Sequence, residues 1–427
     1  GNEPEGGLAL VGSLPARGNP GWRLEDPVTV RLVDSDGAPR AGVPVHWSVA
    51  AGGGSIEPIS TETDAEGLAS AAWTLGPAGE NAITAAVAEG PTVTMSVQAE
   101  AFRVSALAAG FQLGCGIVDG AIWCWGDDAW TGTEHVSIPA DIFGWTLAAP
   151  GRVEGPDDFI AVAVSGAVVC GIDDVGDVLC AAESAPLLSP VPLLPPMRSI
   201  VGTSAFSGEF CGLATIGSEA WCWQSSSLPA KVPQSPAFTA IDIERSFPPG
   251  SAAGILGCGL VSDGAALCWG TGPLGNGTFE PSDVPVAVSG GHSFAEIAVA
   301  GSSACGRKTN GEVWCWGRND QGELGIDGPD AAEPVLSATG VDRIAASQQI
   351  VIALRGGSVD RWGGGEWAGP PGPVATLAGL DVSDFAADGV ECVLLADDQA
   401  WCYGEMWDRS SAFKASLYEP VHPVVDP

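Results

Sequence analysis

Twelve cysteines are the residues of this chain whose type and spacing most clearly indicate chemistry. They fall into six pairs whose members are about ten residues apart: Cys115 with Cys124, Cys170 with Cys180, Cys211 with Cys222, Cys258 with Cys268, Cys305 with Cys315, and Cys392 with Cys402. Structural zinc sites use the tighter Cys-x-x-Cys spacing, whereas pairs of this kind are typical of disulfides in exported proteins. The spacing therefore predicts six disulfides and a secreted or periplasmic location.

The elements that position these cysteines are predicted to be β-hairpins. A Gly-containing turn lies between the members of most pairs, as at Asn310-Gly311 between Cys305 and Cys315. Two short strands around such a corner form a hairpin. A separation of about ten residues then places the two cysteines opposite each other across the hairpin.

The hairpins form an internal repeat of seven units. Six units carry cysteines, and the gap between Cys305 and Cys392 is about twice the usual period. The segment 350–363 fills this gap with the same hydrophobic rhythm and a closing Trp-Gly. We align its two cysteine positions with Val351 and Arg361, so both partners of one bond are absent together.

A strand-rich repeat of about 40–50 residues is typical of a β-propeller. Most units also carry a Pro-Val segment, which gives about four strands per unit, but the first unit lacks one. A spare copy lies at 418–425. We therefore expect residues 101–427 to form a seven-bladed propeller that is closed by the C-terminal strand, which joins the first blade.

Residues 1–100 contain no cysteine and show no such period, so they are expected to be a separate domain behind a short N-terminal tether. Alternating apolar segments at 28–33, 43–49, 68–75, 82–88 and 92–97 are separated by Asp-Gly-type and Glu-Gly-type turns. This pattern predicts a β-sandwich. The expected fold class of the whole chain is all-β.

Two family resemblances support this division. The run from Trp316 to Gly325, Trp-Gly-Arg-Asn-Asp-Gln-Gly-Glu-Leu-Gly, resembles the signature of the regulator-of-chromosome-condensation repeat, which implies a seven-bladed propeller. The first hundred residues resemble the bacterial Ig-like modules of invasin and intimin. In that family such modules are spacers in surface proteins.

The charge balance excludes several partners. Acidic residues outnumber basic ones by 52 to 17, which gives a net charge of −35. This charge repels nucleic acid and anionic lipid, so the chromatin binding of part of the family is not expected here. The nucleotide-exchange role of the resembled family on a small GTPase belongs to a nuclear, reducing setting, which the cysteine pattern contradicts. The sequence also has no apolar run long enough to span a membrane.

No catalytic, metal or cofactor site is expected. The four histidines are scattered and lie in no metal-binding or nucleophile motif. Paired carboxylates can hydrolyse glycosides or bind calcium, but each acidic doublet here is predicted to lie beside a blade turn, where solvated acidic residues are common. The doublets are Asp127-Asp128, Asp157-Asp158, Asp173-Asp174 and Asp397-Asp398.

Aromatic residues outside the repeat are the predicted partner-binding residues. Most of the 16 tryptophans belong to the repeat and are expected to pack blades together. Aromatic side chains on loops at a propeller rim are candidate anchors for a protein partner. Those predicted here are Trp130, Phe143, Trp145, Trp367 and Trp407.

These patterns predict a non-catalytic, exported scaffold or accessory subunit. It would dock through its propeller on the extracytoplasmic side of a membrane-anchored or membrane-embedded assembly, for example an energy-converting complex such as a photosynthetic reaction centre. The polar N-terminus resembles the segment that follows the lipidated cysteine of bacterial lipoproteins, so an N-terminal lipid anchor is a further hypothesis. The alternatives are a cell-surface adhesin and a secreted propeller inhibitor of a hydrolase.

Overall fold

The computed structural model of the chain is built from strands, turns and connecting loops. It describes residues 7–423 except 19–22, 25, 77–78, 101–103, 111–112, 128–146, 167, 183–184, 205–207, 225–226, 247–253, 365–366, 374–381, 389, 396–399, 404–412 and 417–418. None of the described segments forms a helix with the length and apolarity that a bilayer crossing needs. By compactness the chain divides into two units, residues 1–102 with 415–422 and residues 103–414 with 423–427.

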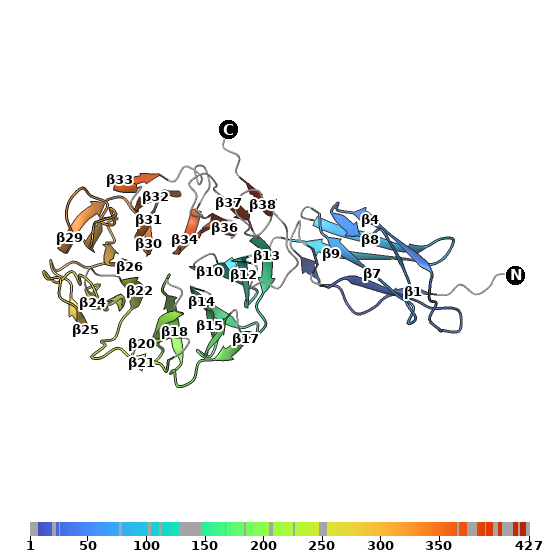
Figure 1. Cartoon of the computed structure of the whole chain (residues 1–427), viewed down its shortest axis with the longest axis horizontal. Coiled ribbons are helices and arrows are strands. Elements are labelled where there is room, and N and C mark those ends of the chain that lie inside the picture. The colour runs from blue at the N-terminus through green and yellow to red at the C-terminus, as the bar shows by residue number, and fades with distance from the viewer. Residues whose placement is uncertain are drawn as a thin grey trace. The chain divides into compact units, whose positions relative to one another are not determined.

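The N-terminal unit contains two β-sheets (Figure 1). The first sheet has the order β1 (Leu8–Leu10), β3 (Val28–Leu32), β7 (Leu68–Thr74) and β5 (Ser55–Glu57). The second has the order β2 (Arg17–Gly18), β9 (Thr92–Ala99), β8 (Gly79–Val87), β4 (Pro44–Ala51) and β6 (Ser60–Glu62). Only the β2–β9 pair is parallel among the registers described for this unit. This is the predicted sandwich.

The alternation of apolar residues explains how the two sheets make one core. Val28, Val30 and Leu32 alternate with more exposed neighbours along β3, so one face of the strand is buried. Trp73 from β7 is fully buried in the same cluster as Trp47 from β4, which belongs to the other sheet. The cluster therefore joins both sheets, as expected for a sandwich.

Residues 104–423 contain seven sheets in their described part, each built from consecutive strands. Blades 1 to 4 are β10 (Val104–Gly110), β11 (Leu113–Val118), β12 (Ala121–Asp127), β13 (Leu147–Arg152); β14 (Phe159–Ser165), β15 (Val168–Asp173), β16 (Val178–Ala182), β17 (Ala185–Pro190); β18 (Met197–Gly202), β19 (Glu209–Ala214), β20 (Ala220–Gln224), β21 (Ala230–Lys231); and β22 (Ala240–Ser246), β23 (Gly254–Leu260), β24 (Ala266–Gly270), β25 (Ser282–Ala287).

Blades 5 to 7 follow the same pattern. They are β26 (Glu296–Ala300), β27 (Ser303–Arg307), β28 (Val313–Gly317), β29 (Ala331–Ala338); β30 (Arg343–Ser347), β31 (Ile350–Arg355), β32 (Ser358–Gly363), β33 (Trp367–Pro373); and β34 (Val382–Asp388), β35 (Val390–Leu395), β36 (Ala400–Tyr403), β37 (Phe413–Ser416), β38 (Glu419–Pro423). All strand pairs whose register is described in these blades are antiparallel, so the strands of a blade alternate in direction.

The first strand of each blade lies at the centre of the ring (Figure 1). Each of these inner strands contacts the inner strand of the next blade in the order β10, β14, β18, β22, β26, β30 and β34. Strand β34 in turn contacts β10, so blade 7 and blade 1 are neighbours. The seven inner strands therefore surround a common axis.

The observed strand order corrects the predicted role of the C-terminal strand. Strand β38 is hydrogen-bonded into the sheet of blade 7, whereas blade 1 draws all four of its strands from residues 104–152. The prediction that the last strand joins the first blade is therefore wrong. The prediction failed because β13 already occupies the outer position of blade 1. This strand follows the long insertion 128–146 and carries no Pro-Val motif.

Five of the six predicted cysteine pairs form disulfides between directly opposed residues of a hairpin, with Cα–Cα distances of 4.0–4.1 Å. In each pair at least one cysteine is buried, so the bonds lie in the interior of the blades. The observed disulfides join Cys115 with Cys124, Cys170 with Cys180, Cys211 with Cys222, Cys258 with Cys268, and Cys305 with Cys315.

The remaining two blades differ from these five. Cys392 and Cys402 of blade 7 are opposed in the register of β35 and β36, but their side chains lie outside the described set, so this disulfide stays a prediction. In blade 6 the residue opposite Arg361 is Ile352. The alignment of Val351 with a cysteine position was therefore wrong by one residue.

A contact between glycine and tryptophan explains the Trp-Gly and Leu-Gly parts of the repeat signature. Trp316 and Trp362 are fully buried in blades 5 and 6. Gly275 of blade 4 lies so close to Trp316 that a Cβ atom on it would be 2.7 Å from the indole Cδ1, and Gly325 of blade 5 is placed in the same way against Trp362. Each glycine therefore accommodates the tryptophan of the following blade, and we call this contact the Gly–Trp latch.

Candidate functional site

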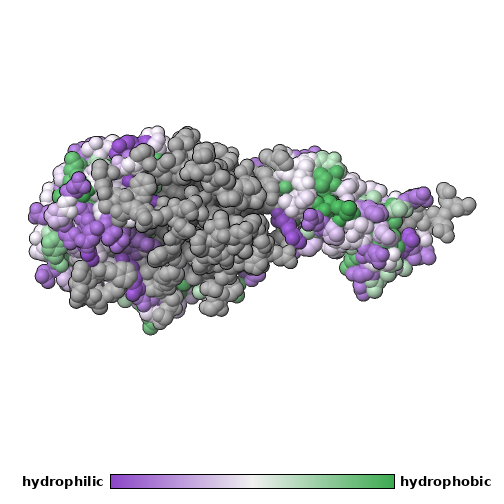
Figure 2. All heavy atoms as spheres, turned by 45° about the horizontal axis from the view of Figure 1, so that its top comes forward, coloured by the Kyte–Doolittle hydropathy of each residue, from purple (hydrophilic) through white to green (hydrophobic). Residues whose placement is uncertain are grey.

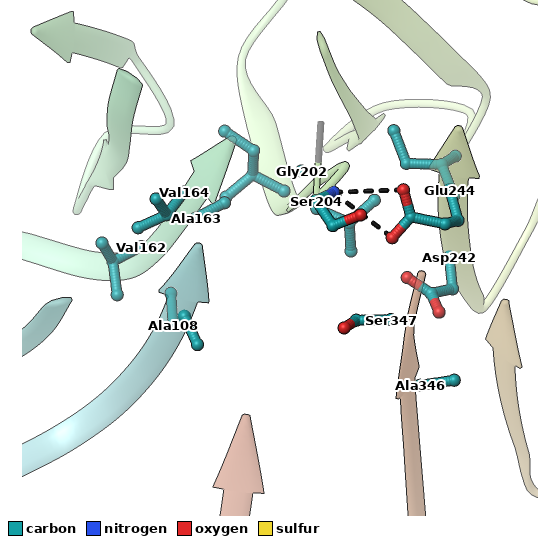
Figure 3. A pocket seen from close by; sticks show the side chains of 14 residues that line it. Ala108, Val162, Ala163, Val164, Gly202, Ser204, Asp242, Glu244, Ala346 and Ser347 are labelled. Carbon is teal, nitrogen blue, oxygen red and sulfur yellow. Dashed lines mark hydrogen bonds between the residues drawn. The ribbon is translucent and has the colours of Figure 1, made fainter. Parts of the chain in front are cut away.

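The inner strands leave a cavity of about 170 Å³ at the axis of the propeller. Its walls come from blades 1, 2, 3, 4 and 6, and they consist mainly of alanine, valine, glycine and serine (Figure 3). Two carboxylic acids, Asp242 and Glu244, break this pattern, and both lie on the same inner strand, β22. Side chains alternate across a strand, so residues two apart face the same side, which brings both acids to the axis.

Glu244 connects three blades through backbone hydrogen bonds. Its Oε1 atom accepts the N–H of Ser204 from blade 3 at 3.1 Å, and its Oε2 atom accepts the N–H of Gln348 from blade 6 at 3.1 Å (Figure 3 shows the bonds to Ser204). The N–H of Arg245 is a further donor, at 2.6 Å. Burial raises the pKa of Glu244, and these donors oppose that shift. Because both oxygens are engaged, we interpret Glu244 as a brace between blades.

Asp242, the second axial acid, also bonds to a neighbouring blade. Its Oδ2 atom accepts the N–H of Val299 from blade 5 at 2.8 Å. Burial raises the pKa of Asp242 to about 7, and the nearby charge of Glu244 acts in the same direction. Perturbed acids are common at functional sites, but they also occur in structural networks. Among the described residues no group of three His, Cys, Asp or Glu side chains could hold a metal ion.

The two faces of the propeller differ in their connections. Strands alternate in direction within a blade, so the turns between second and third strands share a face with the connections from one blade to the next. We call this the hairpin-turn face. The connections from first to second strand and from third to fourth strand lie on the opposite face.

Four exposed aliphatic side chains lie on the hairpin-turn face of blades 2 and 3. Their exposed fractions are 58% for Ile160, 69% for Val175, 74% for Leu193 and 87% for Ile216. Ile160 lies in a bulge at the start of β14, Val175 and Ile216 lie in the turns of two successive hairpins, and Leu193 lies in the connection between the blades. We call these four residues the turn-face patch.

The predicted partner-binding aromatics cannot be compared with this patch directly. Trp130, Phe143, Trp145 and Trp407 lie outside the described residues, and Trp367 begins β33 with a side chain that is also outside the described set. The strands that precede 128–146 and 404–412 are the third strands of their blades, which end on the opposite face. The five aromatic residues remain predictions.

One residue of each described acidic doublet has a structural partner. Asp173 is buried, and its Oδ1 atom accepts the N–H groups of Val175 and Asp177 at 3.1 and 2.7 Å, which closes the hairpin turn of blade 2. Asp157 forms an ion pair with Arg152. The side chains of Asp127-Asp128 and Asp397-Asp398 lie outside the described residues.

Sequence reasoning missed both the axial acids and the turn-face patch. A signal for the acids was present, because Asp242 and Glu244 interrupt an inner strand at positions where β26 has alanines. The patch had a weaker signal, namely an aliphatic residue at the turn positions 175 and 216, where hairpins favour Gly, Asn and Asp. Nothing in the sequence indicated that those turns meet around one connection.

Family models match both parts of the chain. Residues 25–101 match the bacterial Ig-like domain (group 1). Residues 286–323 and 310–354 match two models of the regulator of chromosome condensation (RCC1) repeat. No curated protein sequence matches the chain.

Solved structures share the propeller fold. Human WBSCR16 is 16% identical, with a TM-score of 0.51, over 69% of this chain and 87% of that protein. Prp20p from Saccharomyces cerevisiae is 13% identical, with a TM-score of 0.53, over 68% and 83%. Yeast RCC1 (Prp20) bound to Kap60 is also 13% identical, with a TM-score of 0.54, over 68% and 81%. At these identities the comparison supports the fold alone. The chain is a bacterial Ig-like domain followed by a propeller of the regulator-of-chromosome-condensation type.

Proposed function

We propose that this protein is a non-catalytic, exported scaffold or accessory subunit that docks through its propeller on the extracytoplasmic side of a membrane protein assembly. Propellers of this type act in protein–protein interaction, and the yeast relative has been solved with a bound protein, Kap60. The observation that carries the proposal for this chain is the turn-face patch, because its four exposed aliphatic side chains lie on one face of blades 2 and 3 and offer apolar surface of the kind that partners cover.

The other features are consistent with an exported scaffold. Five disulfides fit an oxidising compartment. In this proposal the N-terminal Ig-like domain acts as a spacer. In the view of Figure 2 the Ig-like unit has a mixed surface of hydrophilic, intermediate and hydrophobic residues, as expected for a domain in contact with water. The axial acids are used for bracing between blades and give no support to a catalytic function.

Purification of the native protein from its own membranes in mild detergent tests this function. We expect it to elute with a membrane assembly at a fixed stoichiometry, and we expect chemical cross-links from the propeller to an integral subunit, read by mass spectrometry. A cytoplasmic protein of similar charge is the control for adventitious binding. Recovery of the protein alone, without cross-links to a membrane subunit, would contradict the proposal.

A further inference from the structure

The structure points to the chemistry of the partner. We propose that the turn-face patch binds a segment of a partner protein that combines apolar side chains with lysine or arginine. This proposal rests on the docking function above, and it adds the surface and the class of ligand. It is carried by the packing of the patch, by the backbone of Leu193 and by the charges around the patch.

The patch is a preformed surface, because hydrogen bonds hold its turns together. The N–H of Met197 donates to the carbonyl oxygen of Gly176 at 2.7 Å, and the N–H of Thr215 donates to that of Pro196 at 2.8 Å. The connection at 196–197 is thereby fixed to the turn of Val175 on one side and to the turn of Ile216 on the other. A partner would therefore meet apolar side chains whose backbone is already ordered, which lowers the entropy lost on binding.

Leu193 is exposed, and its backbone conformation is unfavourable for leucine. Its φ is +66°, and the other non-glycine residues described with positive φ are Glu89, Asp119, Ser218, Gln234 and Gln348, all of them polar. Glycine or asparagine would adopt this conformation more easily than leucine. Leu193 is also 74% exposed, so packing within the protein does not explain the choice. Strain retained at an exposed apolar residue favours a role in binding.

Exposed acidic side chains lie beside two of the patch residues along the chain. Asp157 and Asp158 precede Ile160, and Asp174 and Asp177 flank Val175, and all four are exposed. Two arginines lie at strand ends beside these connections, and both are already engaged. Arg152 pairs with Asp157, and the guanidinium of Arg198 donates to the carbonyl oxygen of Phe238 at 2.6 Å. An apolar surface with an acidic rim is complementary to an apolar segment with basic residues.

The same rim argues against two other occupants. A second copy of this chain would bring its own acidic rim, and a net charge of −35, against the patch. A bilayer of anionic lipid would be repelled in the same way. A basic protein segment would not be repelled by the acidic rim, so we assign the docking surface to such a segment.

Peptide binding to the full-length protein tests the proposal. The probe is a fluorescent amphipathic peptide of about 14 residues made of leucine and lysine, with a leucine–glutamate peptide as the matched control. The patch variant is Val175→Ser, Leu193→Asn and Ile216→Ser together, in which asparagine tolerates the backbone of residue 193. The matched control is Leu228→Ser with Phe279→Ser, which removes two exposed apolar side chains from third-to-fourth-strand connections on the opposite face.

We expect the lysine peptide to bind the wild type and the opposite-face variant equally, and the patch variant at least about tenfold more weakly. Asp174→Asn with Asp177→Asn is expected to weaken binding and to flatten its salt dependence. Equal binding of the glutamate peptide, or undiminished binding to a patch variant of native circular dichroism, would overturn the proposal. So would patch-dependent dimerisation in sedimentation, or patch-dependent binding to vesicles that contain phosphatidylglycerol.

The same patch variant separates this inference from the proposed function. If the variant still co-purifies with the membrane assembly, docking stands and the assignment of the patch fails. If the wild type does not co-purify at all but binds the lysine peptide through the patch, the patch chemistry stands and the membrane-docking function fails.

Discussion

At the scale of single residues, Asp242 gives the molecule an internal dependence on pH. Burial raises its pKa from 3.8 to about 7, so the folded protein holds a proton that the unfolded chain releases. Between these two pKa values the folded state binds more protons, and stability therefore falls as the pH rises. The contribution is fully present below about pH 4 and is lost above pH 7.

The variant Asp242→Asn tests this dependence. Asparagine keeps an oxygen that can accept the N–H of Val299 but carries no charge. We expect the stability of this variant relative to wild type to increase from pH 4 to pH 7, by at most about 4 kcal/mol, and to stay level at higher pH. Denaturant unfolding at pH 4.5, 6 and 8 provides the measurement.

Asp242→Ala distinguishes the charge from the hydrogen bond. Alanine leaves the N–H of Val299 without its acceptor, so Asp242→Ala should be about 1–3 kcal/mol less stable than Asp242→Asn at every pH and should follow the same pH trend. Parallel stability profiles for wild type and Asp242→Asn would show that the carboxyl group does not titrate in this range.

At the scale of elements, the Gly–Trp latch determines how one blade meets the next. Gly275 and Gly325 have positive φ values of +74° and +65°, and each lies against the indole of the following blade. A side chain at these positions is unfavourable for two reasons, the backbone conformation and the contact. The two glycines of the repeat signature thus leave room for a tryptophan at a blade interface within this chain, and the signature does not mark a binding residue.

Comparing Gly275→Ala with Gly340→Ala separates the two reasons. Gly340 has a similar φ of +71° and no atom within 4 Å of its Cβ position, so its substitution should lose only about 1 kcal/mol through the backbone. Gly275→Ala should lose about 1–3 kcal/mol more, because its Cβ would overlap Trp316. Thermal unfolding under identical conditions measures the difference. Equal losses would rule out a steric role for the latch.

The sequence predicted most elements because the relevant interactions are local. Alternation along Val28–Leu32 and the opposed pair of Cys305 and Cys315 depend on neighbours within one strand or one hairpin. The outer strand of blade 1 was missed because Leu147–Arg152 follows a long insertion and lacks the Pro-Val motif. The turn-face patch was missed because Val175 and Ile216 are brought together only by long-range packing, which no local pattern records.

At the scale of the whole molecule, the net charge of −35 opposes the compact state. Folding brings these charges closer together, and their mutual repulsion reduces stability at low ionic strength. Salt shortens the range of the repulsion from about 30 Å at 0.01 M to about 10 Å at 0.1 M. The protein should therefore be less stable in dilute buffer than in moderate salt.

Scanning calorimetry in 0.01 M and 0.1 M sodium chloride measures this effect. We expect the unfolding temperature to rise by about 3 °C or more with salt at neutral pH. Repeating the scans at pH 4.5, where many carboxyl groups are partly protonated, should reduce the increase. An unfolding temperature that is unchanged or lower in 0.1 M salt would show that favourable ion pairs outweigh the repulsion.

The five described disulfides have a consequence for how the chain is made. Each one joins cysteines 9 to 11 residues apart within one hairpin, and none of them connects two blades. In the proposed export, with the N-terminus entering an oxidising compartment first, each cysteine would meet its partner before the cysteines of the next blade arrive. Short loops are also the easiest to close. Correct pairing is therefore favoured by the order of export itself, and we expect little dependence on an isomerase that reshuffles mispaired bonds.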